Sequence, residues 1–195
     1  LGYVSLMLES DVTEQEKIKN LKIVEERLKR LSELIDSFFE FSKILSNDQI
    51  IELDEINLVA VIEKAISNHY EDFSKDNRMI DFKTNKRKIK IKSNEVMLIR
   101  VFDNLIRNAY KHSNGNLDIE INQTDEKVKI KFINDLLYKD LDVDRIFDEF
   151  YTVDISRTKG NTGLGLAIAK EFVEQLNGKI KADKKNNKLI ITIIF

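Results

Sequence analysis

Glycines gather in one part of the chain. Gly160, Gly163 and Gly165 lie within six positions, although the whole sequence has only six glycines. Apolar residues at helical spacing follow them, so we expect a polar loop that leads into an amphipathic helix. A helix that begins among glycines presents unpaired N–H groups and the positive end of its dipole, and no Cβ keeps a polyphosphate away. With Arg157 and Lys159 just upstream, the spacing fits a phosphate site, and a plain loop before a core helix is the alternative.

A second group of polar residues is predicted on one side of a helix over residues 94–112. At about 100° per residue, Asn104, Asn108 and Lys111 fall within about 60° of one another. An apolar stripe adjoins them and would face the core, formed by Leu98, Val101, Leu105 and Ala109. Amide oxygens suit Mg²⁺, which takes few protein ligands beside phosphate oxygens and waters. The helix could therefore line a cleft for a metal-bound phosphate, or these residues could form an ordinary solvated flank.

The elements that must position these residues fall into two parts. From Glu14 to Leu45, apolar residues recur every three or four positions and predict one long amphipathic helix. Residues 1–8 show the same spacing, and we interpret them as the second half of a preceding helix. A lone hairpin would leave much of the apolar stripe in water, so we expect it to pair with another copy in a dimeric four-helix bundle. The absence of an initial Met leads us to expect a fragment of a longer chain.

After this partial hairpin over residues 1–46, residues 47–195 predict a second domain. Strand patterns cover residues 50–56, 79–83, 89–91, 117–122, 128–132, 180–182 and 189–195. Helices are predicted over 58–73, over 94–112, and from the glycine-containing loop to Gly178, which would end the last one. Several mostly antiparallel strands with about three helices are typical of an α+β two-layer sandwich.

The composition excludes several kinds of site. The 195 residues include no cysteine and two isolated histidines, which excludes disulfides and thiolate metal sites and leaves too few ligands for a common zinc site. A net charge of −2 gives no reason to expect nucleic acid or an acidic membrane surface as a partner. No apolar run approaches the roughly 20 residues that a membrane-spanning helix needs.

Three stretches, taken in order, resemble the motifs of one family. Residues 104–112, N-L-I-R-N-A-Y-K-H, resemble the N box of bacterial sensor histidine kinases. Residues 147–157 look like their F box, and residues 160–166, G-N-T-G-L-G-L, look like their G2 box. The order and spacing fit the ATP-binding domain that these kinases share with gyrase-type ATPases. The first 45 residues are similar to the end of the dimerisation and phosphotransfer hairpin of VanS-like kinases. Three ordered motifs are far more specific than one.

The resemblance implies that the chain binds ATP with Mg²⁺. Asn108 would hold the Mg²⁺ that bridges the phosphates, and Asn104 and Lys111 would contact phosphate oxygens. His112 would be a nucleotide contact or a packing residue. A lid with two aromatic anchors, and the start of the helix after it, would supply the remaining residues. These are Phe147, Phe150, Arg157, Lys159, Gly163, Leu164, Gly165 and Leu166.

One motif of the family, the G1 box D-x-G-x-G, is altered. Asn134 lies in phase with the alternating apolar residues of the strand over 128–132, where the resemblance places the aspartate that recognises adenine. Its amide oxygen can still accept a hydrogen bond from the adenine amino group, without the added strength of a charge. Asp135 could take over, but it is out of phase by one residue. Leu136 and Leu137 follow in place of glycine, so this loop must be built differently.

No residue of the chain matches the phosphoacceptor histidine of the family. The resemblance places it upstream of Leu1, so we expect this fragment to bind ATP but to be unable to phosphorylate itself. In the intact kinase, ATP would phosphorylate that histidine, and an aspartate of a response regulator receiver domain would then take the phosphoryl group. We therefore expect two partners, a second copy bound through the hairpin and the cognate regulator. The resemblance implies that a membrane would be reached only through missing N-terminal segments, so we expect this chain to be the cytoplasmic portion of a bacterial membrane sensor.

Two other functions remain open. An ATP-hydrolysing clamp of the gyrase or mismatch-repair type needs a glutamate in the N-box helix to activate water, and Asp103 and Asn104 occupy that neighbourhood. Steady phosphate release would distinguish such a clamp from a kinase. The other alternative is a degenerate kinase that dimerises and docks a regulator without using ATP, which the altered G1 box favours. Titration with nucleotide would separate that scaffold from both enzymes.

Overall fold

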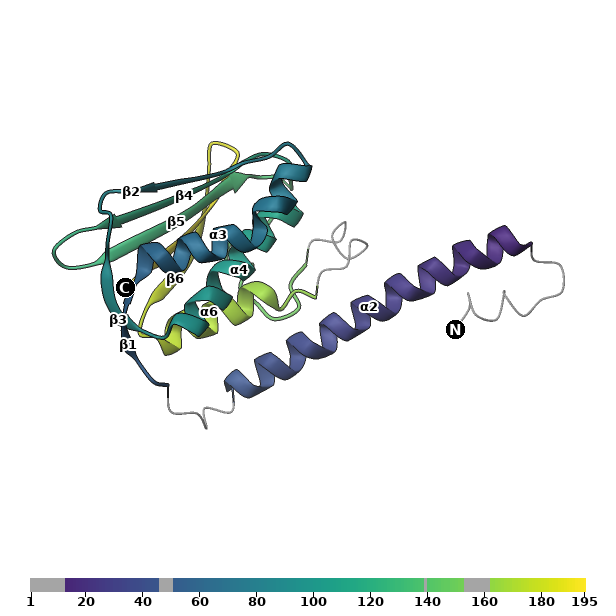
Figure 1. Cartoon of the computed structure of the whole chain (residues 1–195), viewed down its shortest axis with the longest axis horizontal. Helices are drawn as coiled ribbons and strands as arrows, with labels where there is room; N and C mark the ends of the chain where they lie inside the picture. Colours follow the sequence, from purple (N-terminus) through teal and green to yellow (C-terminus); the bar gives the residue numbers. More distant parts are fainter. Residues whose placement is uncertain (1–12, 46–50, 139, 153–161) are drawn as a thin grey trace. The chain divides into compact units, whose positions relative to one another are not determined.

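The structure, a computed structural model, describes residues 13–45, 51–138, 140–152 and 162–195 (Figure 1). The chain divides into two compact units, Leu1–Ser42 and Lys43–Phe195. The domain boundary that the sequence suggests, between residues 46 and 47, stays a prediction, because residues 46–50 lie outside the described part. Within the described residues, no helix is both long enough and apolar enough to span a membrane.

The first unit consists mainly of helix α2 (Glu14–Leu45), which has the bounds that the sequence predicted. It begins with a capping box, since the Thr13 N–H donates to Glu16 Oε2 at 3.0 Å and the Glu16 N–H donates to Thr13 Oγ1 at 3.3 Å. Large apolar side chains along α2 remain 39–66% exposed: Ile18, Leu21, Leu28, Leu31, Leu34, Ile35, Phe38 and Phe39. The apolar stripe is therefore present, and most of it faces solvent in the single chain.

The second unit is built on a five-stranded sheet with the order β2-β4-β5-β7-β6. Strand β2 runs parallel to β4, and the other neighbours are antiparallel. The bounds are β2 (Ile80–Thr84), β4 (Leu117–Gln123), β5 (Val128–Asp135), β6 (Lys179–Lys185) and β7 (Lys188–Ile194). Helices α3 (Leu58–Lys75), α4 (Glu95–His112) and α6 (Gly165–Gln175) cover one face of it (Figure 1). The predicted α+β two-layer sandwich is confirmed.

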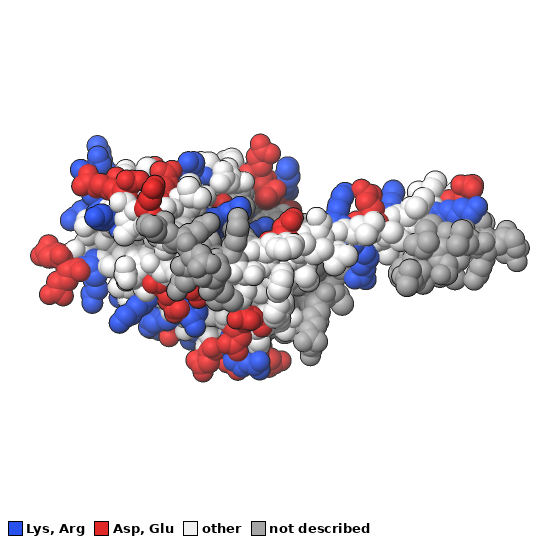
Figure 2. Space-filling model, turned by 90° about the horizontal axis from the view of Figure 1, so that it is seen from below, with Lys and Arg blue, Asp and Glu red and all other residues white. Residues whose placement is uncertain are grey.

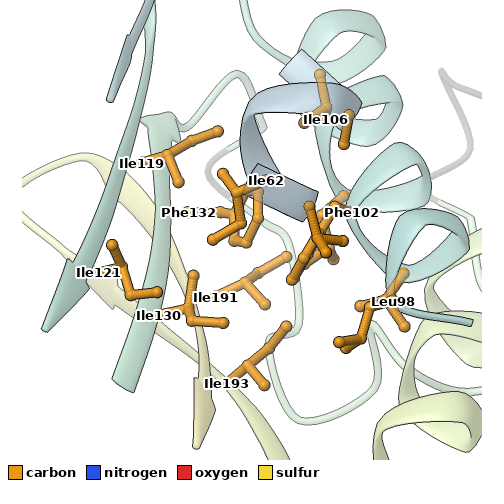
Figure 3. Close-up of a cluster of buried hydrophobic side chains, with 14 of the residues drawn as sticks. Ile62, Leu98, Phe102, Ile106, Ile119, Ile121, Ile130, Phe132, Ile191 and Ile193 are labelled. Carbon is orange, nitrogen blue, oxygen red and sulfur yellow. The ribbon is translucent and has the colours of Figure 1, made fainter. Parts of the chain in front are cut away.

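The core lies between these helices and the sheet (Figure 3). Every second residue of β5 is buried, and the register places Phe132 between Ile119 of β4 and Ile191 of β7. Helix α4 adds Phe102, whose ring centroid lies 5.9 Å from that of Phe132. Each large apolar side chain buried in this way contributes about 1.5–3 kcal/mol. The apolar side chains on one face of the strands thus pack against the apolar side chains of the helices in one core.

The two strands on either side of the basic turn, K-T-N-K-R-K at residues 83–88, do not pair with each other. Strand β2 joins β4 in the large sheet, whereas β3 (Lys90–Ser93) pairs with β1 (Asp54–Asn57) in a separate two-stranded sheet. The predicted strand over 50–56 is therefore shorter and later than expected, within the described residues. Main-chain and side-chain bonds explain the choice of partner, because the Leu58 N–H donates to Ile89 O at 2.8 Å and the Ile89 N–H donates to Asn57 Oδ1 at 3.2 Å.

Asparagine residues close two of the helices. Just beyond the end of α6, Asn177 has φ +60°, and the N–H groups of Asn177 and Gly178 donate back into the last turn at 2.9 and 2.8 Å. Helix α3 is terminated in the same way by Asn77 just beyond its end, with φ +55°. The sequence pointed to Gly178 as the terminator of α6. Its actual constraint is space, since a Cβ there would lie 2.6 Å from the Phe195 ring.

Acidic and basic side chains are interspersed over the face seen in Figure 2. Among the charged side chains of the second unit, some pair between strands, such as Lys188 with Asp118 at 3.4 Å and Lys131 with Glu120 at 3.7 Å. Exposed pairs of this kind contribute about 0–1 kcal/mol each. The buried core, and not the charged surface, therefore dominates the stability of the second unit.

Candidate functional site

The two polar motifs that the sequence singled out meet where α4 passes the start of α6. Asn104 is 8% exposed, and its Oδ1 accepts a hydrogen bond from Arg107 Nη2 at 3.1 Å. A Cβ placed on Gly165 would lie 3.2 Å from the same oxygen. Glycine therefore allows the first residue of α6 to approach the buried amide of α4. Arg107 was not among the predicted site residues, and its contact with Asn104 is the signal that identifies it.

The other polar residues of α4 follow Asn104 toward the end of the helix. Asn108 and His112 are half-buried, and Lys111 is exposed. Spacing of three or four residues places them along one side of the helix, as predicted. Helix α4 begins with a side-chain cap, because Asn94 Oδ1 accepts a hydrogen bond from the Met97 N–H at 3.0 Å.

The start of α6 lies next to Phe150 of the F-box segment. Gly163 has φ +71°, and a Cβ on it would lie 2.6 Å from the Phe150 carbonyl carbon. Phe150 itself has φ +58° and a side chain that is 51% exposed, whereas Phe147 is half-buried and packs against the core. The predicted lid residues Arg157 and Lys159 lie outside the described residues.

Helix α6 itself offers backbone donors at this point. Its N-cap is Leu164, which is fully buried and has no side-chain oxygen to cap the helix, and Leu166 is half-buried in the first turn. The N–H groups of a first turn have no partner within the helix, so they are available to an anion. The position next to Asn104 is thus suited to phosphate oxygens.

The altered box places Asn134 and Asp135 in different surroundings. Asn134 is 4% exposed, and its Nδ2 donates to the Asp135 carbonyl oxygen at 2.9 Å. This bond uses the Nδ2 group of the amide and does not involve Oδ1. Asp135 is exposed, and its carboxylate occupies the space that a Cβ on Gly115 would need. Of the two residues, Asn134 is therefore the one whose environment suits recognition of a base.

Larger residues stand at both glycine positions of that box. Counted from Asn134, the third and fifth residues are Leu136 and Tyr138, so Tyr138 and not Leu137 stands at the second glycine position. The Leu136 N–H donates to Asn187 O at 2.8 Å, which continues the strand pairing beyond β5. The Tyr138 ring meets the His112 ring edge-on, with centroids 6.2 Å apart, and its buried hydroxyl has no hydrogen-bond partner among the described residues. Tyr138 is a site residue that the sequence reasoning missed.

The acidic residue next to Asn104 is already engaged. Asp103 Oδ1 lies 2.9 Å from Nε2 of His69 on α3, and both side chains are about four-fifths buried. No role was assigned to His69 from the sequence. The pair joins α3 to α4 and directs the Asp103 carboxylate toward α3. This position therefore resembles a structural contact more than a base that activates water.

The side-chain oxygens at this site suit a metal ion that is held mainly by the oxygens of a bound phosphate. Within the described part of the chain, no group of three or more His, Cys, Asp or Glu side chains could hold an ion. Mg²⁺ commonly takes only one or two protein oxygens and completes its shell with phosphate oxygens and waters. The Asn108 amide oxygen, on α4 beside Asn104, is the donor that fits such a site.

Comparisons with known proteins agree with this arrangement. Residues 93–195 match the family of histidine kinase-, DNA gyrase B-, and HSP90-like ATPases. The chain is 30% identical over 192 residues to the sensor protein VanS of Enterococcus faecium, covering 96% of this chain and 50% of VanS. It is 35% identical over 173 residues to the sensor protein kinase WalK of Staphylococcus aureus, covering 84% of this chain and 40% of WalK. The chain thus spans half or less of the length of these curated relatives.

Solved structures show the same fold. The catalytic domain of the histidine kinase ThkA aligns with a TM-score of 0.66 and 25% identity, covering 74% of this chain and 95% of that domain. ThkA solved in complex with the response regulator protein TrrA aligns with a TM-score of 0.76 and 23% identity, covering 100% of this chain and 55% of ThkA. The family match covers α4, β5 and α6, the elements that bring the amide side chains of α4 to the start of α6. The chain therefore belongs to the histidine kinase-, DNA gyrase B- and HSP90-like ATPase family, as an ATP-binding domain of the sensor histidine kinase kind.

Proposed function

We propose that this chain binds ATP with Mg²⁺ as the catalytic part of a sensor histidine kinase. The observation that carries the proposal is the approach of Asn104 to Gly165, which unites two motifs far apart in the sequence. A buried amide next to the open first turn of a helix gives a neutral acceptor and a set of N–H donors at one point. Such a pairing suits a phosphate chain with its metal.

Each residue of the site then has a place along the nucleotide. The first turn of α6 and Lys111 would bind phosphate oxygens, and Asn108 would hold Mg²⁺, which when bound neutralises phosphate charge. Asn134 would accept a hydrogen bond from the adenine amino group through Oδ1, the oxygen that its bond to the Asp135 carbonyl leaves available. His112 would lie beside the base, at the far end of α4 from Asn104.

The kinase reaction would need a histidine that this chain does not supply. Its two histidines, His69 and His112, lie on α3 and α4 in the second unit, and neither is on α2. We therefore propose that the phosphoacceptor belongs to another part of the intact protein and that this chain alone does not phosphorylate itself. Positioning and charge neutralisation would dominate catalysis of the transfer.

The partners are proposed on the same basis. The exposed stripe on α2 supports a homodimer formed through the hairpin. ThkA has been solved with its response regulator protein, and we propose that a receiver domain likewise takes the phosphoryl group from the intact kinase here. The relatives are named as sensor proteins. We accordingly propose that the chain is the cytoplasmic portion of a membrane sensor.

Calorimetric titration with a non-hydrolysable ATP analogue, with and without Mg²⁺, tests the proposal. We expect Mg²⁺-dependent binding that Asn108→Ala weakens about tenfold or more, the usual cost of losing a group that sets a metal site. Asn122→Ala, which changes an exposed asparagine on β4, is the matched control and should bind like the parent. Equal binding by Asn108→Ala would remove that residue from the site.

A degenerate scaffold is the second candidate, because Leu136 and Tyr138 replace both glycines of the G1 box. The same titration decides between the two. Absence of binding at millimolar nucleotide would exclude the ATP-dependent function and leave the dimeric scaffold as the better explanation of the fold.

A further inference from the structure

Arg78 lies outside the predicted site and binds the end of α4, the helix that carries most of that site's polar side chains. Arg78 follows α3, and its guanidinium donates three hydrogen bonds to main-chain oxygens. Nη2 donates to Ala109 O at 3.2 Å and Nη1 donates to Tyr110 O at 2.8 Å, both in the last turn of α4. Nε donates to Gly115 O at 2.7 Å, in the connection to β4. All three guanidinium nitrogens are therefore used on the end of one helix and the chain that leaves it.

Aromatic rings and a carboxylate surround this guanidinium. Its central carbon lies 4.7 Å from the Phe73 ring centroid and 5.1 Å from that of Tyr110, which suits a planar cation. Burial lowers the pKa of Arg78, and the nearby Asp76 acts in the opposite direction. Asp76 also accepts a hydrogen bond from the Tyr110 hydroxyl, which raises the pKa of Tyr110. The cation remains charged at neutral pH.

The residue after Arg78 holds the same connection. The Met79 N–H donates to Asn116 Oδ1 at 2.9 Å, and the Leu117 N–H donates to Met79 O at 3.0 Å. Residues 78 and 79 thus bind the end of α4, the turn after it and the first residue of β4. The Arg78 side chain and the Met79 main chain, just before β2, therefore both hold the connection from α4 to β4.

These hydrogen bonds take the place of the main-chain termination that α3 and α6 have. A left-handed asparagine follows each of the helices α3 and α6, and the main-chain bonds there satisfy the last carbonyl groups of the helix. Helix α4 is instead followed by Ser113 in an extended conformation, with φ −137° and ψ 153°. Without such a motif, its last carbonyls need a donor from elsewhere. Arg78 supplies that donor, and its charge lies at the negative end of the α4 dipole.

The turn that Arg78 caps is the one that carries the nucleotide-facing residues. Lys111 and His112 follow directly after Ala109 and Tyr110, and Asn108 precedes them. We propose that Arg78 is a positioning residue that holds the last turn of α4 in the conformation in which Asn108, Lys111 and His112 bind nucleotide. The inference rests on the proposed ATP site, and it adds a residue from the connection after α3, outside the predicted binding residues. Loss of the guanidinium would let this turn unwind while the core beneath it stays packed.

Two histidines in the whole chain make the test sharp, because each imidazole gives its own NMR signals. His112 reports on the turn that Arg78 caps, and His69 reports on the α3–α4 contact through Asp103. For Arg78→Gln we expect ADP affinity, measured by calorimetry, to fall about tenfold, in the range found when a residue that orients a binding group is lost. The His112 signals should shift in the free protein, and the His69 signals should stay in place. Arg87→Gln, on the exposed basic turn, is the matched control and should change neither reading.

The outcomes separate this inference from the proposed function. If the parent chain binds no ADP, the ATP site itself is wrong and the inference fails with it. If the parent binds and Arg78→Gln binds equally well, or if the signals of both histidines move together, only the positioning role is overturned. Should Arg78→Gln fail to fold, Arg78→Lys keeps the charge without the three-way fork. It should still shift His112 alone and weaken ADP binding, and parent-like behaviour would overturn the inference.

Discussion

Helices α2 and α4 show the same apolar period in the sequence and have opposite outcomes in the structure. On α4, Leu98, Phe102 and Leu105 are at most 1% exposed. On α2, Leu28 is 60% exposed and Phe39 is 66% exposed. A 3.6-residue period states which residues share a face, but it does not state what covers that face. The apolar side chains of α2 and α4 therefore differ in exposure because of what packs against each helix, and not because of the helical pattern itself.

Helix α4 finds its cover within the second unit. Ile119, Ile130 and Ile191 of the sheet lie beneath the helix layer, with Ile62 of α3 beside it (Figure 3). For α2 we propose that the cover is a second copy of the chain. Exposed apolar area on this scale on a helix is typical of an interaction surface.

Core truncation should give the largest contrast between the two helices. Phe102→Ala should lower the free energy of unfolding of the second unit by about 3–5 kcal/mol, because it opens a cavity against Phe132. Phe38→Ala on α2, where the side chain is 50% exposed, should change it by no more than about 0.5 kcal/mol. Urea unfolding followed by circular dichroism at low protein concentration measures both. Similar losses would mean that α2 is part of the same cooperative core.

A charge placed in the α2 stripe should act on assembly instead of on folding. Leu28→Glu should weaken self-association at least about tenfold, since each factor of ten corresponds to about 1.4 kcal/mol of lost apolar contact and added desolvation. Sedimentation equilibrium of the parent, Leu28→Glu and the apolar control Leu28→Met gives the mass as a function of concentration. The thermal midpoint of the second unit should not change. A parent chain that stays monomeric at the highest concentration would contradict the proposed homodimer.

The smallest effect is expected where α3 meets α4, at the Tyr110 hydroxyl. The hydrogen bond to Asp76 raises the pKa of Tyr110, so the folded state holds this proton more tightly than the unfolded chain. The resulting stabilisation is complete below the unfolded pKa of about 10 and is lost as the pH rises through the higher folded pKa.

Tyr110→Phe should therefore be less stable than the parent near neutral pH, and the gap should narrow above about pH 10. Urea unfolding across this range measures the gap. Tyr70→Phe, at an exposed tyrosine on α3, is the control for the substitution itself. A gap that stays constant across the range would show that the hydroxyl bond does not contribute to folding.

Local pattern predicted much of this fold. The bounds of α2 are as expected, and α4 begins one residue later than expected and ends at His112. The β4–β5 and β6–β7 hairpins were also predicted, because each pairs neighbours across a short turn. The pairing of β2 with β4 was not predicted, since it joins strands separated by β3 and α4. Such a choice depends on which surfaces the intervening elements leave available.

The candidate site likewise has features that the sequence predicts and contacts that it does not. The residue types of Asn104, Asn108 and the glycines follow from the sequence, and their order on a known family pattern identified the ATP-binding domain. The roles of those residues stay predictions until nucleotide is titrated. The sequence could not indicate Tyr138 against His112 or Arg78 on the end of α4, because neither contact follows a local period.

The sequence by itself determined the helical and strand periods, the polar side of α4 and the glycines before α6, because each depends on residues within a turn or two of one another. Tertiary structure alone decided that Asn104 lies against Gly165, that Asp103 turns to His69 and that Arg78 ends α4. These contacts join residues more than 30 positions apart. They exist only once strand register and helix packing have brought the segments together, so no single stretch of sequence contains them.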